Sequence, residues 1–449
     1  MLRVFGSHKS RNCAGMSRRD FVQVGSLGMA GLALPSLLRS RAAAAQSGAS
    51  TSAPAKAVIL YWLDGGPTHI ETYDPKPLAP AEYRGPLGTI DTNVQGIQLS
   101  ELLVKHARQM DKVSLLRSVH HDNGDHFAAG HWMLTGYHGS TAADMDPQYP
   151  SVGAVIGKVK GPNKPNLPAY VAVPYAATIG LRPGYMSAAY LGVANNPFDA
   201  GDPGQANYQV QNLNLPGGIN LDRVGDRKSL LASFDKLRRE VDQSGLMNGL
   251  DSFNQQAFEM ITGDDARRAF DVAGEDPRSR DRFGRDTYGQ SALLARRLVQ
   301  AGVTFVAIHN GGWDHHGQIK EGMQGRLPSM DQSIAALIED LDQTGLLDST
   351  IVCVMGEFGR TPRINGSAGR DHWGNVMSVL LGGGGLKGGT VVGASNDKGE
   401  YPAELPLKPA DVLATIYRQM GVDLDTHFVN RAGRPISINN YGTPIEALL

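Results

Sequence analysis

Three continuous runs of apolar and β-branched residues constrain the fold of this 449-residue chain most strongly. They cover residues 57–63, 303–308 and 350–355, and each is followed within a few positions by glycine and by an acidic residue. Apolar runs of this length are typical of strands that are buried on both faces of a parallel sheet. We therefore predict an α/β fold in three layers, with a mostly parallel sheet and helices on both of its faces.

The remaining predicted elements alternate in the rhythm expected of βαβ units. We expect strands at 113–119, 169–173 and 376–381, and helices at 99–110, 125–134, 152–159, 288–301, 327–344 and 409–420. The composition changes at about 175–285, where Pro, Gly and Asn clusters precede two charged helical stretches at 228–243 and 250–261. We interpret this region as an insertion or cap on a single domain at 56–449, which follows a linker at 46–55.

The first 45 residues have the pattern of an export signal. Arg18 and Arg19 form a twin-arginine motif, which a weakly apolar stretch at 22–38 and small residues at 42–45 follow. A membrane anchor is the alternative, but the stretch is short for a span and is interrupted by glycines and a proline. We expect a signal peptide at 1–45, a periplasmic or extracellular location, and no membrane span after signal removal.

Charge and cysteine content narrow the function classes. The formal net charge of -1, with mixed signs along the chain, provides no basic face for a phosphate backbone, so nucleic acid is set aside as a partner. Of the two cysteines, Cys13 lies in the signal and Cys353 lies in an apolar run. We therefore expect no disulfide. The sequence does not determine the oligomeric state.

Five residues near the predicted strand ends are candidate metal ligands: Asp64, Asp314, His316, Glu357 and His372. Open α/β sheets bind ligands beyond the carboxyl ends of their strands, so we expect these side chains to form one site. Their carboxylates and imidazoles suit a divalent metal, with zinc favoured over calcium or magnesium.

Each of these segments also has a simpler interpretation. Asp314 and His316 follow the Gly311-Gly312 turn, and in isolation they would suit a solvated polar turn equally well. Arg360 follows Glu357 by three residues and could pair an anionic substrate or a neighbouring carboxylate. An ion pair that closes the strand end is the alternative. The metal site is favoured because several such segments occur together.

Histidine is concentrated at residues 120–138, which hold five of the thirteen histidines of the chain. Such a density favours a functional role, and His121, His126 or His131 could transfer protons or ligate metal. Thr68 is a possible nucleophile near Asp64, but we favour a capping role for it. The chain has no HExxH, GxSxG or CxxC motif, which argues against zincins, α/β-hydrolases and thiol oxidoreductases.

The segments at 63–77, 313–316, 356–362 and 371–373 resemble a family catalogued as domain of unknown function 1501. This family is common in exported bacterial proteins and is placed in the alkaline phosphatase and sulfatase superfamily. The resemblance implies an alkaline-phosphatase-like core and an ester hydrolase with one or two metal ions. It also implies that the metal ligands fall on the same five residues as above.

The resemblance further implies a nucleophile position at His126, because residues 133–138 are similar to the segment that follows the nucleophile in sulfatases. Two departures matter. Phe358 stands where the superfamily usually has a histidine ligand, and His126 stands where it has Ser, Thr or a modified Cys. The scaffold is therefore better supported than the reaction.

Together these features predict an exported metal-dependent hydrolase of a phosphate or sulfate ester, acting on a small molecule or a glycan. Its predicted catalytic residues are His126, His121 and Arg360. The alternative is a non-catalytic member that binds a glycan or a protein partner through a degenerate metal site. Metal-dependent transfer to an acceptor other than water is a third possibility.

Overall fold

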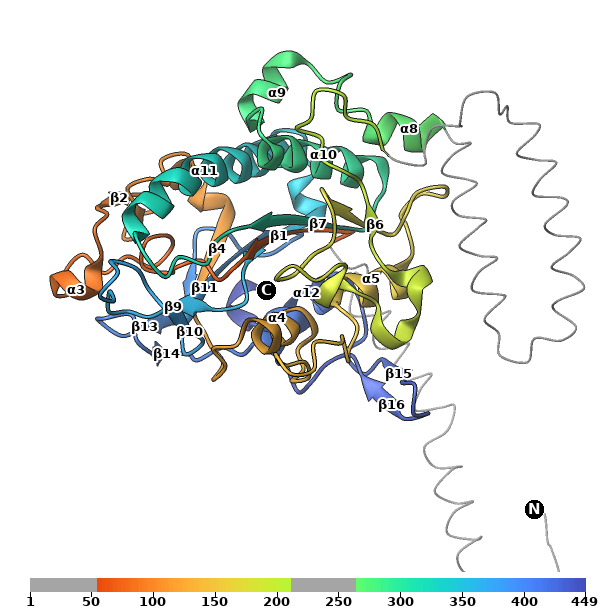
Figure 1. Cartoon of the computed structure of the whole chain (residues 1–449). Coiled ribbons are helices and arrows are strands. Elements are labelled where there is room, and N and C mark those ends of the chain that lie inside the picture. Colours follow the sequence, from red (N-terminus) through yellow and green to blue (C-terminus); the bar gives the residue numbers. More distant parts are fainter. Residues whose placement is uncertain (1–54, 211–263) are drawn as a thin grey trace, which may run out of the picture. The chain divides into compact units, whose positions relative to one another are not determined.

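The computed structural model describes residues 55–210 and 264–449 (Figure 1). The predicted signal peptide at 1–45, nearly all of the linker, and the predicted helices at 228–243 and 250–261 lie outside the described residues. Within the described residues, no helix combines the length and apolar character that crossing a membrane requires.

The centre of the described region is an eight-stranded sheet in the order β12-β4-β11-β8-β1-β7-β5-β6. The three apolar runs of the sequence form three adjacent parallel strands: β7 (Phe305–Gly311), β1 (Ala57–Asp64) and β8 (Thr350–Met355). All eight residues of β1 are buried, as expected for a strand covered on both faces.

The other strands of this sheet are β4 (Val113–Val119), β5 (Tyr170–Val173), β6 (Phe198–Asp199), β11 (Met377–Gly383) and β12 (Val391–Val392). All the pairings are parallel except those of β11, which runs antiparallel to both β4 and β8. Strand β6 lies in the segment that the sequence indicated as an insertion, yet it pairs with β5 at the sheet edge.

Helices cover both faces of the sheet. In Figure 1, α10 (Thr287–Ala301) and α11 (Ile319–Gln343) lie on one side, and α4 (His126–Thr135), α5 (Val152–Lys160) and α12 (Pro409–Gln419) lie on the other. Alternate residues of β1 belong to two separate apolar cores: Ile59 and Tyr61 to one, and Val58 and Trp62 to the other. The predicted fold class, a three-layer α/β core with a mostly parallel sheet, is confirmed.

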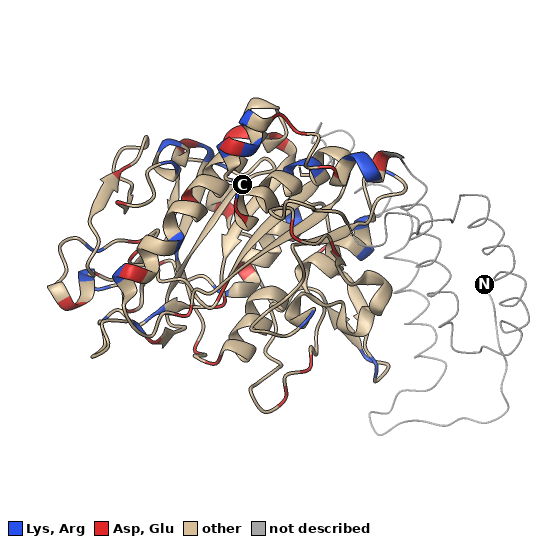
Figure 2. Ribbon diagram, turned by 45° about the horizontal axis from the view of Figure 1, so that its top comes forward, with Lys and Arg blue, Asp and Glu red and all other residues tan. Residues whose placement is uncertain are grey.

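Shorter elements surround this core. They are α3 (Ala81–Arg84), β2 (Thr89–Asp91), β3 (Gln98–Ser100), α8 (Asp264–Phe270), α9 (Pro277–Phe283), β9 (Gly359–Arg360), β10 (His372–Trp373), β13 (Ala394–Ser395), β14 (Pro402–Glu404), β15 (His427–Val429) and β16 (Pro435–Ser437). Figure 2 shows Lys and Arg interspersed with Asp and Glu along the helices and loops.

Two helix predictions differ from the structure. Residues 99–110 do not form an α-helix; the chain there contains the end of β3 and a 3-10 turn at His106–Arg108. The Asp331 carboxylate accepts hydrogen bonds from the backbone N–H of Lys105 and His106, at 2.9 and 2.8 Å, and this long-range contact fixes the turn. Helix α11 includes Pro328 and begins at Ile319, eight residues before the predicted start at 327.

Buried neutral histidines should make the fold sensitive to acid. Burial lowers the pKa of both His69 and His131 to about 4. The His131 ring donates from Nδ1 to the Tyr137 carbonyl at 2.9 Å and accepts at Nε2 from the Tyr149 N–H at 3.3 Å, which requires the neutral form.

Because the unfolded pKa is about 6.5, we expect each histidine to contribute stability that is complete above that pH and is lost between roughly pH 6.5 and 4. Urea unfolding at a series of pH values measures this loss. His131→Asn should lose less stability on acidification than the wild type, whereas His427→Asn, a change at an exposed position, should match the wild type. Equal losses in all three proteins would contradict the prediction.

Candidate metal centre

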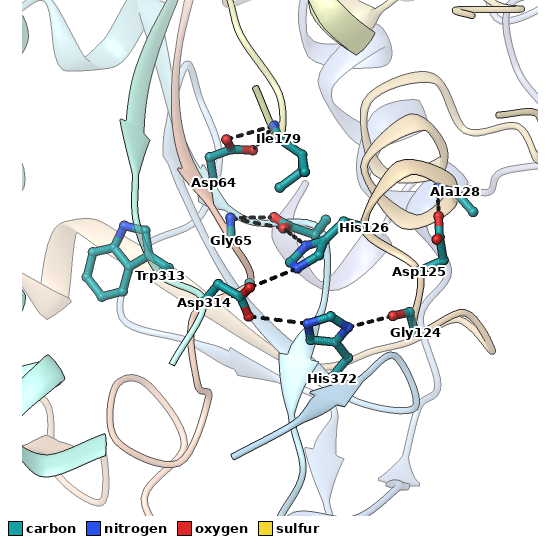
Figure 3. Close-up of polar contacts among 12 residues, drawn as sticks. Asp64, Gly65, Gly124, Asp125, His126, Ala128, Ile179, Trp313, Asp314 and His372 are labelled. Atoms are coloured by element: carbon teal, nitrogen blue, oxygen red, sulfur yellow. Dashed lines mark hydrogen bonds and ion pairs between the residues drawn. The ribbon is translucent and has the colours of Figure 1, made fainter. Parts of the chain in front are cut away.

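The site lies beyond the carboxyl ends of three adjacent parallel strands. Asp64 ends β1, Asp314 follows β7, and Glu357 follows β8, so sheet topology places all three carboxylates at one edge. Gly65 allows close approach, because a Cβ there would lie 2.7 Å from the backbone nitrogen of Asp314. His126 is added to this edge from the first turn of α4, whose start is fixed by the Asp125 carboxylate (Figure 3).

Three acceptor atoms converge at the centre of the site. His316 Nε2 lies 3.0 Å from Asp314 Oδ1, His372 Nε2 lies 3.2 Å from the same oxygen, and the two imidazole nitrogens are 2.9 Å apart. The opposite nitrogens of both rings face acceptors: His316 Nδ1 faces Asp371 Oδ1 at 2.7 Å, and His372 Nδ1 faces the Gly124 carbonyl at 2.8 Å. With a hydrogen on each Nδ1, both Nε2 lone pairs point toward the Asp314 carboxylate.

These separations fit a metal ion. Two ligand atoms about 2.0–2.1 Å from one ion lie about 2.8–3.0 Å apart in octahedral geometry and about 3.3–3.4 Å apart in tetrahedral geometry. The distances of 2.9, 3.0 and 3.2 Å in the structure lie between about 2.8 and 3.4 Å, as expected for ligands of one ion. His126, Asp314 and His372 also offer ligand atoms that all lie within 4.8 Å of one another. One carboxylate with two or three imidazoles is a donor set that suits zinc. The alternative explanation for the 2.9 Å distance between the two Nε2 atoms is a proton shared between them.

His126 lies between Glu357 and Asp314 and contacts both carboxylates. Its Nδ1 faces Glu357 Oε1 at 2.7 Å, and its Nε2 lies 3.4 Å from Asp314 Oδ2. Burial alone would lower the pKa of His126, but the hydrogen bonds with Asp314 and Glu357 outweigh burial and raise the pKa to about 9. The fully buried Glu357 carboxylate also accepts from the Gly65 N–H at 2.9 Å. Glu357 therefore orients His126, and the Phe358 ring packs against that imidazole at 4.8 Å.

Arg360 positions Asp314. Its fully buried guanidinium donates from Nη2 to Asp314 Oδ1 at 2.6 Å, from Nε to the Gly66 carbonyl at 2.7 Å, and from Nη1 to the Arg370 carbonyl at 3.2 Å. Burial by itself would raise the pKa of Asp314, but hydrogen bonds with His126, His372 and Arg360 hold it well below its usual range. Of the two roles expected for Arg360, the structure supports pairing with a neighbouring carboxylate, because the buried guanidinium cannot contact an anionic substrate.

Asp64 faces away from the three converging atoms. Its carboxylate accepts from the Ile179 N–H at 2.9 Å (Figure 3). It also accepts from Trp62 Nε1 at 3.0 Å and lies 3.1 Å from His309 Nε2. Among the described residues it has no hydrogen bond with Asp314, His316 or His372, so its role as a metal ligand stays a prediction. His309 was not identified from the sequence. Its position near the carboxyl end of an apolar strand could have indicated that it lies close to Asp64.

His121 supports the backbone of the site. Its Nε2 lies 2.7 Å from the Glu357 carbonyl, its Nδ1 accepts from the Asn123 N–H at 3.2 Å, and burial lowers its pKa to about 4. Because both ring nitrogens are already bonded, His121 positions Glu357 and has no nitrogen available for a substrate. Asp371 pairs with His316 and not with its sequence neighbour His372.

A family model described as "Protein of unknown function (DUF1501)" matches residues 55–449. No curated protein sequence matches the chain. Similar solved structures include Ps i-CgsB, at 11% identity over 82% of this chain and 72% of that one, with a TM-score of 0.40.

The PsFucS1 sulfatase from Pseudoalteromonas sp. matches at 11% identity over 87% of this chain and 72% of that one, with a TM-score of 0.34. The phosphonate monoester hydrolase SpPMH from Silicibacter pomeroyi matches at 12% identity over 82% and 74%, with a TM-score of 0.33. At these identities and TM-scores the likenesses are remote, and they transfer no activity to this chain.

Proposed function

The chain belongs to the DUF1501 family, whose description states no reaction. From the geometry of the candidate metal centre, we propose that the protein is a metal-dependent hydrolase of a phosphate or sulfate ester. The observation that carries this proposal is the convergence of Asp314 Oδ1, His316 Nε2 and His372 Nε2 within 3.2 Å of one another. These three residues would hold one divalent ion, with zinc favoured. When bound, such an ion supplies positive charge that polarises an ester oxygen.

The protein itself would supply the proton for the leaving group. In hydrolysis, a water oxygen bonds to phosphorus or sulfur, and the bond to the bridging ester oxygen breaks. The electron pair stays on that bridging oxygen, which takes a proton from His126 Nε2. The proton lost by the attacking water restores His126, and the products are an alcohol and inorganic phosphate or sulfate. Glu357 fixes the ring for this transfer through its 2.7 Å contact with Nδ1.

The contacts around Glu357 support one ion rather than two. His126 already contacts both Glu357 and Asp314, and Phe358 packs beside it. The second candidate function is a non-catalytic protein that binds a glycan or a protein partner. It is favoured because the Glu357 carboxylate already contacts the Gly65 N–H and the His126 ring and so has less capacity to bind a metal ion. Metal content and turnover together separate the two functions.

Metal analysis of the folded full chain is the first test. We expect about one divalent metal ion per chain, with zinc favoured. We also expect the protein to hydrolyse p-nitrophenyl phosphate or p-nitrophenyl sulfate, and we expect a chelator to abolish this activity and added metal to restore it. A metal-loaded protein that turns over neither ester would favour the binding function. If the folded protein takes up no divalent metal, both the hydrolase function and binding through a metal site are excluded.

Export by the twin-arginine route, to the periplasm or beyond, is part of the same proposal and rests on Arg18 and Arg19. Replacing both residues by lysine should leave the unprocessed chain in the cytoplasm, whereas the wild type is exported and shortened by about 45 residues. Cell fractionation with immunoblotting measures this difference. Normal export of the lysine variant would contradict the proposed route.

A further inference from the structure

A groove lies on the other side of the strand that carries His372. It has a volume of about 670 Å³ and is lined by the loop at 361–366 and by Tyr83, Asp371, Trp373, Glu400 and Tyr401. We propose that this groove binds a saccharide that carries sulfate or phosphate groups, which would make the substrate an anionic glycan ester. The inference rests on the proposed function and names the substrate class of the same site.

The groove and the metal centre share a wall. His372 and Trp373 are consecutive residues of β10, and side chains at consecutive strand positions point to opposite faces. Asp371 lines the groove and also contacts His316 Nδ1 at 2.7 Å. A molecule bound in the groove would therefore lie directly beside the residues that converge on the candidate ion.

Aromatic rings form one part of the groove. The Trp373 indole is fixed by donation from Nε1 to the Glu400 carbonyl at 2.7 Å. The Tyr401 ring meets it edge to face at 5.6 Å, although 51% of Tyr401 is exposed to solvent. The exposed Tyr401 ring and the hydrogen-bonded Trp373 indole suit the apolar C–H face of a sugar ring, because aromatic side chains offer large contact area with little loss of entropy.

Polar groups form the rest of the groove. Arg363 is exposed, and among the described residues its guanidinium has no hydrogen-bond or ion-pair partner. The Glu400 carboxylate is held by Asn396 Nδ2 at 3.0 Å, so it presents a fixed acceptor for a hydroxyl group. The Arg363 guanidinium would pair one sulfate or phosphate group of a sugar, while the Asp371 and Glu400 carboxylates would accept hydrogen bonds from its hydroxyl groups. The volume lies within the range of about 300–1,000 Å³ that is common for ligand pockets.

Calorimetry with the Asp314→Ala variant tests binding without turnover. The probes are sulfated chondroitin and carrageenan tetrasaccharides, each compared with its unsulfated counterpart. We expect a sulfated probe to bind at least about 10-fold more tightly than its unsulfated counterpart. Introducing Tyr401→Ala or Arg363→Gln into the Asp314→Ala protein should weaken binding of the sulfated probe by about 10-fold. Tyr441→Ala, at a position 97% exposed outside the groove, is the matched control and should change nothing.

The possible failures are distinguishable. If no sulfated probe binds, or if Tyr401→Ala and Arg363→Gln both bind like the parent, the groove proposal is overturned even when p-nitrophenyl ester turnover is present. If the wild type binds the sulfated probes but hydrolyses no ester, the groove assignment stands and the hydrolase proposal fails. Both groove substitutions are at solvent-accessible side chains, so loss of folding would not mimic loss of binding; thermal unfolding checks this.

Discussion

Replacing Asp314 by alanine is expected to abolish metal binding and ester hydrolysis together. Asp314 supplies the only carboxylate among the three converging ligand atoms, and its loss leaves two imidazoles beside the buried Arg360 guanidinium. That guanidinium would then repel a cation without a compensating negative charge. We expect metal content to fall from about one ion per chain to near zero, and kcat/KM to fall at least about 10³-fold.

Plasma emission spectroscopy and single-substrate kinetics measure the two effects. Asp122→Ala is the matched control, because Asp122 is an exposed acid in the same histidine-rich region and makes no side-chain contact with the converging ligands. It should keep wild-type metal content and activity. An Asp314→Ala protein that is folded and retains its metal would contradict the ligand assignment.

Replacing Arg370 by methionine is expected to have the largest effect on stability. Arg370 and Glu71 form a buried ion pair, with Arg370 Nη2 2.6 Å from Glu71 Oε1 and side-chain exposures of 0% and 1%. Arg370 also donates to the carbonyls of Tyr83 and Thr361 at 2.9 and 3.0 Å. Removing one partner leaves a buried charge uncompensated, which costs about 3–5 kcal/mol of unfolding free energy.

Urea unfolding measures this loss. Arg418→Met removes an arginine from a solvent-exposed pair with Glu446 and should cost no more than about 1 kcal/mol. Adding Glu71→Gln to Arg370→Met should recover part of the lost stability, because the uncompensated charge is then removed. Equal losses from the Arg370 and Arg418 substitutions would show that the buried pair has no special contribution.

The sequence predicts the position of the site because local patterns determine it. Apolar runs end at Asp64, before Asp314 and before Glu357, and the rule that parallel strands share a carboxyl edge brings the three segments together. The helix predicted at 125–134 also forms, as α4 (His126–Thr135). These features need no knowledge of distant contacts.

Features that depend on distant residues could not be predicted in this way. Asp64 turns toward the backbone N–H of Ile179, which lies 115 positions further along the chain, and toward His309 on the adjacent strand. The turn at His106 is fixed by Asp331, which is 225 positions away. The partner of Asp371 is His316 and not its sequence neighbour, because the direction of a side chain at a strand end depends on the tertiary structure.

The most direct test of the central claim is anomalous X-ray diffraction from crystals of the metal-loaded protein, recorded on both sides of the metal absorption edge. We expect one anomalous peak within about 2.0–2.2 Å of Asp314 Oδ1, His316 Nε2 and His372 Nε2. Clear density for those side chains with no anomalous peak between them, and with the two Nε2 atoms still 2.9 Å apart, would show that a shared proton and not a metal ion holds the histidines together.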